Sequence, residues 1–151
     1  MPGRHRGFGP QGGAALSMWM RAIPSVVLAL TALINVVRGF IHAFTPDGGA
    51  HSIAGLDLTS GSATILSLFA TIGLQQIVLG VFEFAAALRY RRLVTFLLAF
   101  QAAITAVSLI NLYAWRPLPV VVPGQTFNLV LLGVEILALA IALRREGAEH
   151  S

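Results

Sequence analysis

The chain consists of four long runs of apolar residues separated by short polar segments. The runs cover about residues 22–44, 62–88, 93–115 and 126–143. Even the shortest run, of 18 residues, would reach about 27 Å as an α-helix, which is close to the roughly 30 Å hydrocarbon core of a bilayer. We therefore predict an all-α fold, a four-helix transmembrane bundle.

The segments between the runs are rich in residues that favour turns. The first connection reads TPDGGAHSIAGLDLTSG, the second is the short RYRR, and the third is RPLPVVVPGQ. The N-terminal stretch is rich in Gly, Pro and Arg and has no apolar period. We therefore expect a flexible basic tail over residues 1–20, one four-helix domain over 21–145, and a short C-terminal tail over 146–151.

The composition agrees with this interpretation. Hydrophobic residues make up 56% of the 151 residues and charged residues only 11%, whereas a soluble domain carries about 25% charged residues. The net charge of +4 and the pI near 11.1 do not indicate nucleic acid as a partner, because the charges lie between the apolar runs. We expect the lipid bilayer as the main partner, with a membrane protein partner or a homo-oligomer as alternatives.

The positions of the arginines predict the orientation, because positive charge concentrates on the cytoplasmic side of membrane proteins. Arg116 alone lies in the connections on one side of the predicted bundle. Eight arginines lie on the other side: Arg4, Arg6, Arg21, Arg89, Arg91, Arg92, Arg144 and Arg145. We therefore expect both termini to be cytoplasmic, in a multi-pass protein of the inner membrane. All ten basic residues are arginine, which we ascribe to GC-rich coding in a bacterium.

Polar and small residues recur within each run at spacings of three, four or seven, which places them on one face of each helix. Two interpretations remain open: the stripes hold the helices together by packing and hydrogen bonds, or they line a polar cavity that binds a ligand. Both predict the same helix faces. The candidate intramembrane residues are Asn35, Arg38, His42, Gln76, Glu83, Gln101, Asn128 and Glu135.

A buried charge is expensive in hydrocarbon unless it is paired. Counting from the outer ends of the predicted helices, Arg38 lies about 9 Å deep and Glu135 about 14 Å deep, so we predict an ion pair between them. The alternative is that Arg38 extends to the outer headgroups while Glu135 is protonated. Glu83 lies nearer the inner rim, where it could meet Arg89, or Arg21 or Arg144 across the bundle.

The first connection contains residue types that can ligate a metal, namely Asp47, His51 and Asp57 after His42. No recognised ligand spacing is present, so we expect a solvated loop without a metal, which could also cover the bundle as a lid. The chain has no cysteine and no nucleotide-binding or hydrolase motif. We predict no cofactor and no catalytic residues.

Three segments resemble those of a known group of proteins. They are Arg38 with the GFIH that follows it, the loop from PDGGA to AGLDL, and LFATIGLQQIVLGVFEFAAALRYRRLV. They resemble the DoxX-like small four-helix bacterial membrane proteins of unknown function, over most of residues 30–143. The resemblance implies the fold and the location, and no activity. AFTPD stands here where DoxX itself has a lysine after the helix-one motif, so we carry over no redox-partner role.

Three functions are compatible with these features. The first is a non-catalytic membrane component or accessory subunit with a polar bundle interior, which the absence of a catalytic constellation favours. The second is a small-molecule or proton-linked transporter or carrier that works as an oligomer, using Glu83 and Glu135. The third is a lipid- or quinone-directed membrane enzyme with its site at Arg38, His42 and Asp47; we rank it last because nothing there is visibly activated.

Overall fold

The computed structural model describes residues 11–117 and 122–149, with side chains for residues 22–117 and 122–148. The described chain is helical and contains no strand. Its long helices are α1 (Gln11–Phe44), α2 (Ser62–Arg89), α3 (Val94–Ile110) and α4 (Pro123–Glu149), and α3 is flanked by the 3₁₀ turn η1 (Arg91–Leu93) and the π-helical turn η2 (Asn111–Trp115). The predicted all-α fold with four long helices is confirmed.

Four helical stretches of 23 to 28 residues, with mean hydropathy from 1.8 to 2.2, are long and apolar enough to cross a membrane. Their outer surfaces carry large apolar side chains, with Val78 72% exposed, Phe96 67% and Leu137 64%. Water would solvate such surfaces poorly, whereas lipid solvates them well. The molecule is therefore compatible with a multi-pass membrane protein.

Two helices are longer than the hydrophobic runs that predicted them. Helix α1 begins at Gln11, ahead of residue 22, and α4 covers the predicted 126–143 and extends beyond it at both ends. Pro123 suits the first turn of α4, because the backbone N–H that proline lacks has no partner there. The part of the predicted flexible tail in residues 1–10 lies outside the described residues.

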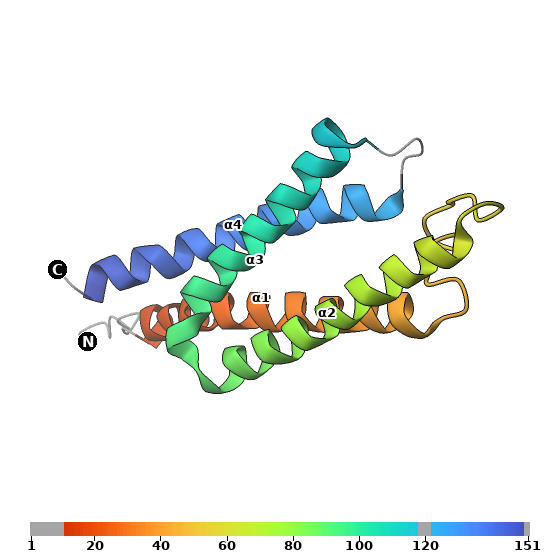
Figure 1. Ribbon diagram of the computed structural model, residues 1–151. Helices are drawn as coiled ribbons and strands as arrows, with labels where there is room; N and C mark the ends of the chain where they lie inside the picture. The colour runs from red at the N-terminus through yellow and green to blue at the C-terminus, as the bar shows by residue number, and fades with distance from the viewer. Residues whose placement is uncertain (1–10, 118–121, 150–151) are drawn as a thin grey trace, which may run out of the picture.

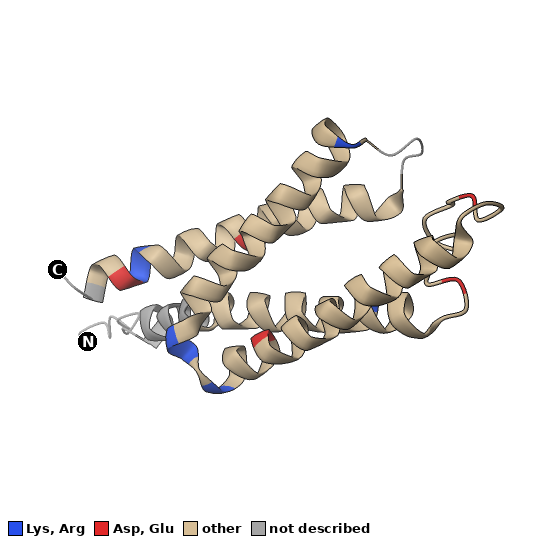
Figure 2. Ribbon diagram, viewed as in Figure 1, with Lys and Arg blue, Asp and Glu red and all other residues tan. Residues whose placement is uncertain are grey.

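The four helices form an elongated bundle, shown in Figure 1. The α2–α3 turn, the start of α1 and the end of α4 lie together at one end, which we call the turn end. Residues 45–61 and the start of α4 lie at the other end, which we call the loop end. Helix α1 packs most extensively against α2, and α3 against α4. Charged residues gather at the two ends and are sparse between them (Figure 2).

Glycines allow the backbones of α1 and α2 to touch. A Cβ atom added to Gly39 would lie 2.5 Å from the carbonyl oxygen of Gly73, and one added to Gly73 would lie 2.6 Å from that of Gly39. At Gly80 the added Cβ would lie 2.7 Å from the carbonyl oxygen of Ala32. Small residues at helix crossings permit this close approach in membrane proteins, so the glycines of the α2 stripe serve packing.

The turn end of the bundle is closed by an apolar cluster. Its fully buried members include Leu28 of α1, Ala86 of α2 and Leu98 of α3, with Ala138 of α4 at 1% exposed. All four helices thus contribute to one packed core. The cluster separates the bundle interior from the turn end.

Candidate functional site

Polar residues from all four helices meet inside the bundle, next to the apolar cluster. None is more than 7% exposed, and Glu83 and Glu135 are completely buried. We call this set the polar cluster: Thr31, Asn35, Glu83, Gln101, Thr105 and Glu135. The stripes that helical spacing predicted therefore point towards one another.

The two carboxyl groups of the polar cluster come from different helix pairs and lie within electrostatic reach of each other. The Asn35 amide lies next to Glu83, and the Gln101 and Thr105 side chains lie next to Glu135. Even so, no oxygen of either carboxyl group has a hydrogen-bond partner among the described residues. Buried polar atoms are normally satisfied, so these oxygens are available to a proton or a cation.

Two glutamines share this property. The Oε1 atoms of Gln101 and Gln76 are buried without a partner in the part of the chain that the structure describes. Gln76 lies seven residues, two helical turns, from Glu83 towards the loop end on the same face of α2. The Thr105 hydroxyl donates to the backbone carbonyl of Gln101 at 3.0 Å, so it does not provide a hydrogen bond to the side-chain Oε1 of Gln101.

The predicted ion pair between Arg38 and Glu135 is not formed. The Nη1 atom of Arg38 donates to Oδ1 of Asn128 at 2.9 Å, and the Glu135 oxygens have no hydrogen-bond partner among the described residues. The pair does not form because the two residues lie at different depths in the bundle. Because α4 begins at Pro123, Glu135 lies twelve residues, about 18 Å, below its loop end, while Arg38 lies six residues, about 9 Å, below the end of α1. Asn128 is at the depth of Arg38.

Glu83 also lacks the rim partner that its sequence position suggested. Glu83 is fully buried, whereas Arg89 is exposed, and no ion pair joins them. Residues six apart lie on different sides of a helix, since neighbours on one face are three or four apart. Glu83 therefore faces the bundle interior and Arg89 the exterior.

A pocket of about 340 Å³ lies at the loop end, and we call it the loop-end pocket. Arg38 and His42 of α1 are its strongly polar lining residues, and its remaining wall is mainly apolar. The wall consists of Ile41, Gly49, Ile53, Ala54, Leu56, Phe69, Leu112, Val122, Pro123 and Gly124. Small-ligand sites typically combine an apolar wall with a few placed polar groups.

The orientation of His42 is fixed by two contacts. Its Nδ1 lies 2.7 Å from the carbonyl oxygen of Gly48, and its ring meets Phe69 edge-on at 5.2 Å between centroids. A carbonyl oxygen only accepts, so we assign the proton to Nδ1, which leaves Nε2 as an acceptor when the ring is neutral. Sequence spacing predicted His42 as a site residue and gave no indication of this tautomer.

The loop of residues 45–61 folds against the helices as a cover over the pocket. Gly48 and Gly49 adopt φ of 60° and 74°, and Ala50 is fully buried. Oδ1 of Asp47 accepts from the Gly49 amide at 3.0 Å and Oδ2 from the Ser52 amide at 2.7 Å. These hydrogen bonds lower the pKa of Asp47 to about 2, so Asp47 has a structural role in the loop.

The other loop candidates do not join the pocket. His51 is exposed, with Nδ1 3.2 Å from the carbonyl oxygen of Leu56. Asp57 accepts from the amide and hydroxyl of Thr59, which lowers its pKa. The described residues contain no group of three His, Cys, Asp or Glu side chains that could hold a metal ion. The four residues of this region that could ligate a metal are therefore dispersed.

A pH titration tests the structural role of Asp47 in the 45–61 loop. The folded-state pKa of about 2 lies below the ordinary 3.8, so the carboxylate stabilises the loop above pH 3.8 and loses this effect as pH falls through 2. We expect the Gly49 and Ser52 amide resonances to titrate together in NMR spectra with a midpoint near 2. In Asp47→Asn this titration should vanish, and a wild-type midpoint at or above 3.8 would contradict the assignment.

The loop-end pocket and the polar cluster are contiguous along α1. Arg38 is one turn from Asn35, whose amide lies next to Glu83. Beyond Glu83 the apolar cluster closes the turn end. None of the described lining residues of the pocket is a serine, threonine, cysteine or acid. These residues offer binding groups and no nucleophile paired with a base.

The sequence suggested that the first connection could cover the bundle as a lid, but it did not identify the apolar residues that line the pocket. Phe69 and Ile53 read there as ordinary hydrophobic positions of a helix and a loop. Gln125 was also missed: it is 4% exposed, and its Oε1 accepts from the Val122 amide at 3.2 Å at the start of α4. A glutamine in the first turn of a helix is a known capping signal that could have identified it.

No protein-family model matches the chain, and no curated protein or solved structure is significantly similar to it. The resemblance to DoxX-like proteins therefore stays a prediction.

Proposed function

We propose that the protein is a non-catalytic component of a bacterial inner membrane that binds a small, largely apolar ligand in the loop-end pocket. The observation that carries the proposal is the pocket itself, which combines about 340 Å³ of mainly apolar space with the Arg38 guanidinium and His42. Membership of the DoxX-like group is part of the proposal and rests on the resemblance of the sequence motifs around Arg38.

The direction of entry follows from the charge distribution. Arg89, Arg91 and Arg92 belong to the α2–α3 turn and Arg144 and Arg145 to the end of α4, all at the turn end. Arg116 follows η2, on the loop-end side of α3. By the positive-inside rule, the turn end and both termini are cytoplasmic in this proposal. The ligand then enters from the outer side, beneath the 45–61 loop.

The pocket chemistry defines the ligand class. A guanidinium has five N–H donors in a fixed fork, and the hydrogen bond to Asn128 uses one nitrogen of Arg38. The remaining donors suit a carboxylate or carbonyl oxygen of the ligand, while Ile41, Ile53 and Phe69 contact its apolar part. We propose an amphiphile with one acidic or carbonyl group.

Native mass spectrometry of protein extracted from its own membrane without delipidation tests this proposal. We expect a retained small molecule in wild-type protein. Arg38→Gln should reduce its occupancy roughly tenfold to a hundredfold, because a hydrogen bond to a charged group contributes about 1.5–3 kcal/mol. Ala54→Phe, which fills the pocket, should do the same, whereas Ala103→Phe on the exposed surface of α3 should not.

The opposite result has a clear meaning. An empty pocket together with a stoichiometric protein partner would contradict ligand binding and favour the accessory-subunit function. Equal occupancy in wild type, Arg38→Gln and Ala54→Phe would place the retained molecule elsewhere on the protein.

A proton-linked carrier is the second candidate, favoured by the polar cluster. Glu83 and Glu135 are fully buried without a partner among the described residues, and an unpaired charge is expensive at that depth. Each carboxyl group would therefore hold a proton in the closed bundle and release it when the interior is hydrated.

A further inference from the structure

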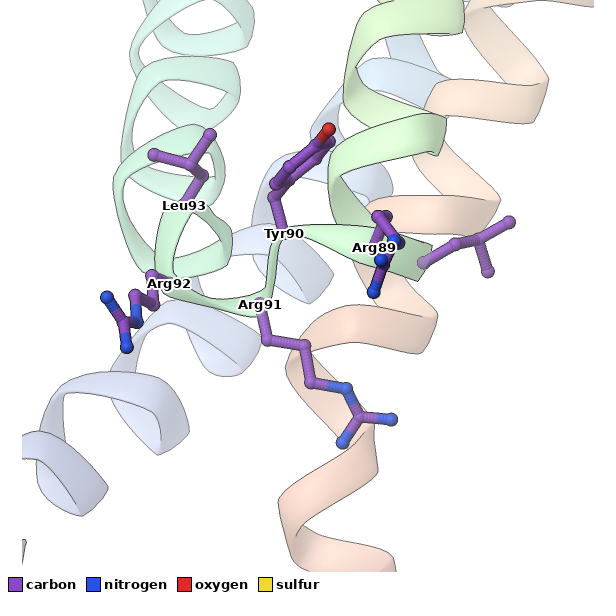
Figure 3. A pocket seen from close by; sticks show the side chains of 6 residues that line it. Arg89, Tyr90, Arg91, Arg92 and Leu93 are labelled. Atoms are coloured by element: carbon purple, nitrogen blue, oxygen red, sulfur yellow. The ribbon is translucent and has the colours of Figure 1, made fainter.

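A second hollow lies at the turn end, about 730 Å³ in volume and open to the surface. Its lining among the described residues is a run of six, Leu88, Arg89, Tyr90, Arg91, Arg92 and Leu93. Figure 3 shows Arg91 and Arg92 extending from the turn away from the bodies of α2 and α3, while Leu93 and Tyr90 point back along the helices. The turn therefore separates charged from apolar and aromatic side chains.

The arginines of this turn have no paired counter-charge in the part of the protein that the structure describes. The side chains of Arg89, Arg91 and Arg92 make no hydrogen bond or ion pair with any residue in the described ranges. Glu146, an acid at the same end, accepts from the Thr95 hydroxyl at 2.6 Å. Three unpaired guanidinium groups on one short turn attract anions.

The place of the turn in the fold identifies the kind of anion. Helices α2 and α3 are long and apolar enough to cross a membrane, and only residues 90–93 separate them. A connection this short holds its side chains at the depth of the lipid headgroups. Leu93 and Tyr90 then face the acyl region, as aromatic and apolar residues do at interfaces.

We infer that the turn from Arg89 to Leu93 is a binding site for the phosphate headgroup of an anionic phospholipid. Guanidinium groups bind phosphate oxygens in a bidentate manner, and the exposed Leu88 and Leu93 provide contacts for the acyl chains of the same lipid. The site is separate from the loop-end pocket, so the inference goes beyond the proposed function and does not depend on it.

Lipid retention from vesicles of known composition tests the inference. The full-length protein is reconstituted into equal parts phosphatidylglycerol and phosphatidylcholine, extracted gently, and its bound lipids are identified by native mass spectrometry. We expect wild-type protein to retain phosphatidylglycerol preferentially. In the double variant Arg91→Gln/Arg92→Gln the preference for phosphatidylglycerol over phosphatidylcholine should fall about 25-fold. Each interfacial arginine contributes roughly a factor of five to the affinity for an anionic lipid.

Arg116→Gln provides the matched control, because it removes an exposed arginine near the loop end. The lipid preference of this control should equal that of wild type. The preference of Arg91→Lys/Arg92→Lys should lie between those of wild type and the Gln double variant, because lysine keeps the charge but lacks the forked donor geometry of the guanidinium. Circular dichroism confirms the helix content of each variant. If the Gln variant does not fold, the Lys variant carries the test.

Three results would overturn the inference. The first is an unchanged preference in the Gln or Lys double variant. The second is an equal loss in Arg116→Gln, which would indicate general electrostatic attraction. The third is displacement of the lipid by millimolar inorganic phosphate, which would indicate a site for the free anion.

Discussion

Gly73→Ala is expected to destabilise the folded protein by about 1–3 kcal/mol, the usual cost of overpacking. The added Cβ would lie 2.6 Å from the carbonyl oxygen of Gly39, 2.8 Å from the amide nitrogen of Ala43 and 2.8 Å from Cβ of His42. Two of these three atoms belong to the backbone and cannot turn aside, so α1 and α2 must separate. The loss of stability is measured by unfolding the protein in a denaturing detergent and following its helix content by circular dichroism.

Gly133→Ala in α4 is the control for this substitution. A Cβ at Gly133 meets nothing within 4 Å, and alanine favours a helix over glycine by about 1 kcal/mol. This variant should therefore be as stable as wild type or more stable. Equal stability of the two variants would contradict the close packing of α1 on α2.

Gly73→Ala should also affect the loop-end pocket. Because the new methyl group presses on His42, the ring is expected to move relative to Phe69 and Gly48, which it contacts in the structure. Ligand occupancy in the native mass spectrum should fall together with stability. Gly133→Ala should leave occupancy unchanged.

If the protein is a proton-linked carrier, Glu83→Gln combined with Glu135→Gln is expected to abolish its activity while leaving the fold intact. Glutamine has nearly the shape of a protonated glutamic acid, and neither carboxyl group has a hydrogen-bond partner among the described residues to lose. Infrared spectroscopy of the reconstituted protein at neutral pH should show the carbonyl band of a protonated carboxyl group in wild type. The double variant should lack this band, and proton flux into vesicles should fall to the background rate.

The single variants and a surface control sharpen this test. Each single Gln substitution should remove part of the band, whereas Glu146→Gln, at an exposed position outside the polar cluster, should remove none. A wild-type protein without the band would show that the pair is ionised and would contradict proton binding. A band without any flux in wild type would reject the carrier and leave the ligand-binding proposal intact.

Sequence spacing predicted the helices and their inward faces because both depend on short-range periodicity. Asn35, Glu83, Gln101 and Glu135 were identified in this way, and all four are buried together. The partner of Arg38 was predicted wrongly because depth depends on where α4 begins. A shift of three residues, from 126 to 123, moves Glu135 about 4.5 Å deeper.

The loop-end pocket could not be predicted because its walls depend on the fold of the 45–61 loop. Ile53 and Ala54 reach the pocket only because positive φ at Gly48 and Gly49 turns the chain back over α1. Hydrogen bonds from the Gly49 and Ser52 amides to Asp47 hold that turn. Hydrophobic periodicity contains no information about such a path.

The helices pack most extensively in two pairs, which we call the two halves of the bundle, and glycines bring the backbones of one pair into contact. One half is the closely packed pair α1 and α2, and the other is α3 with α4. Glu83 belongs to the first half and Glu135 to the second. A motion that separates the halves would change the distance between the two carboxyl groups. If the pair binds protons as proposed, its proton occupancy and the opening between the halves would be thermodynamically linked equilibria.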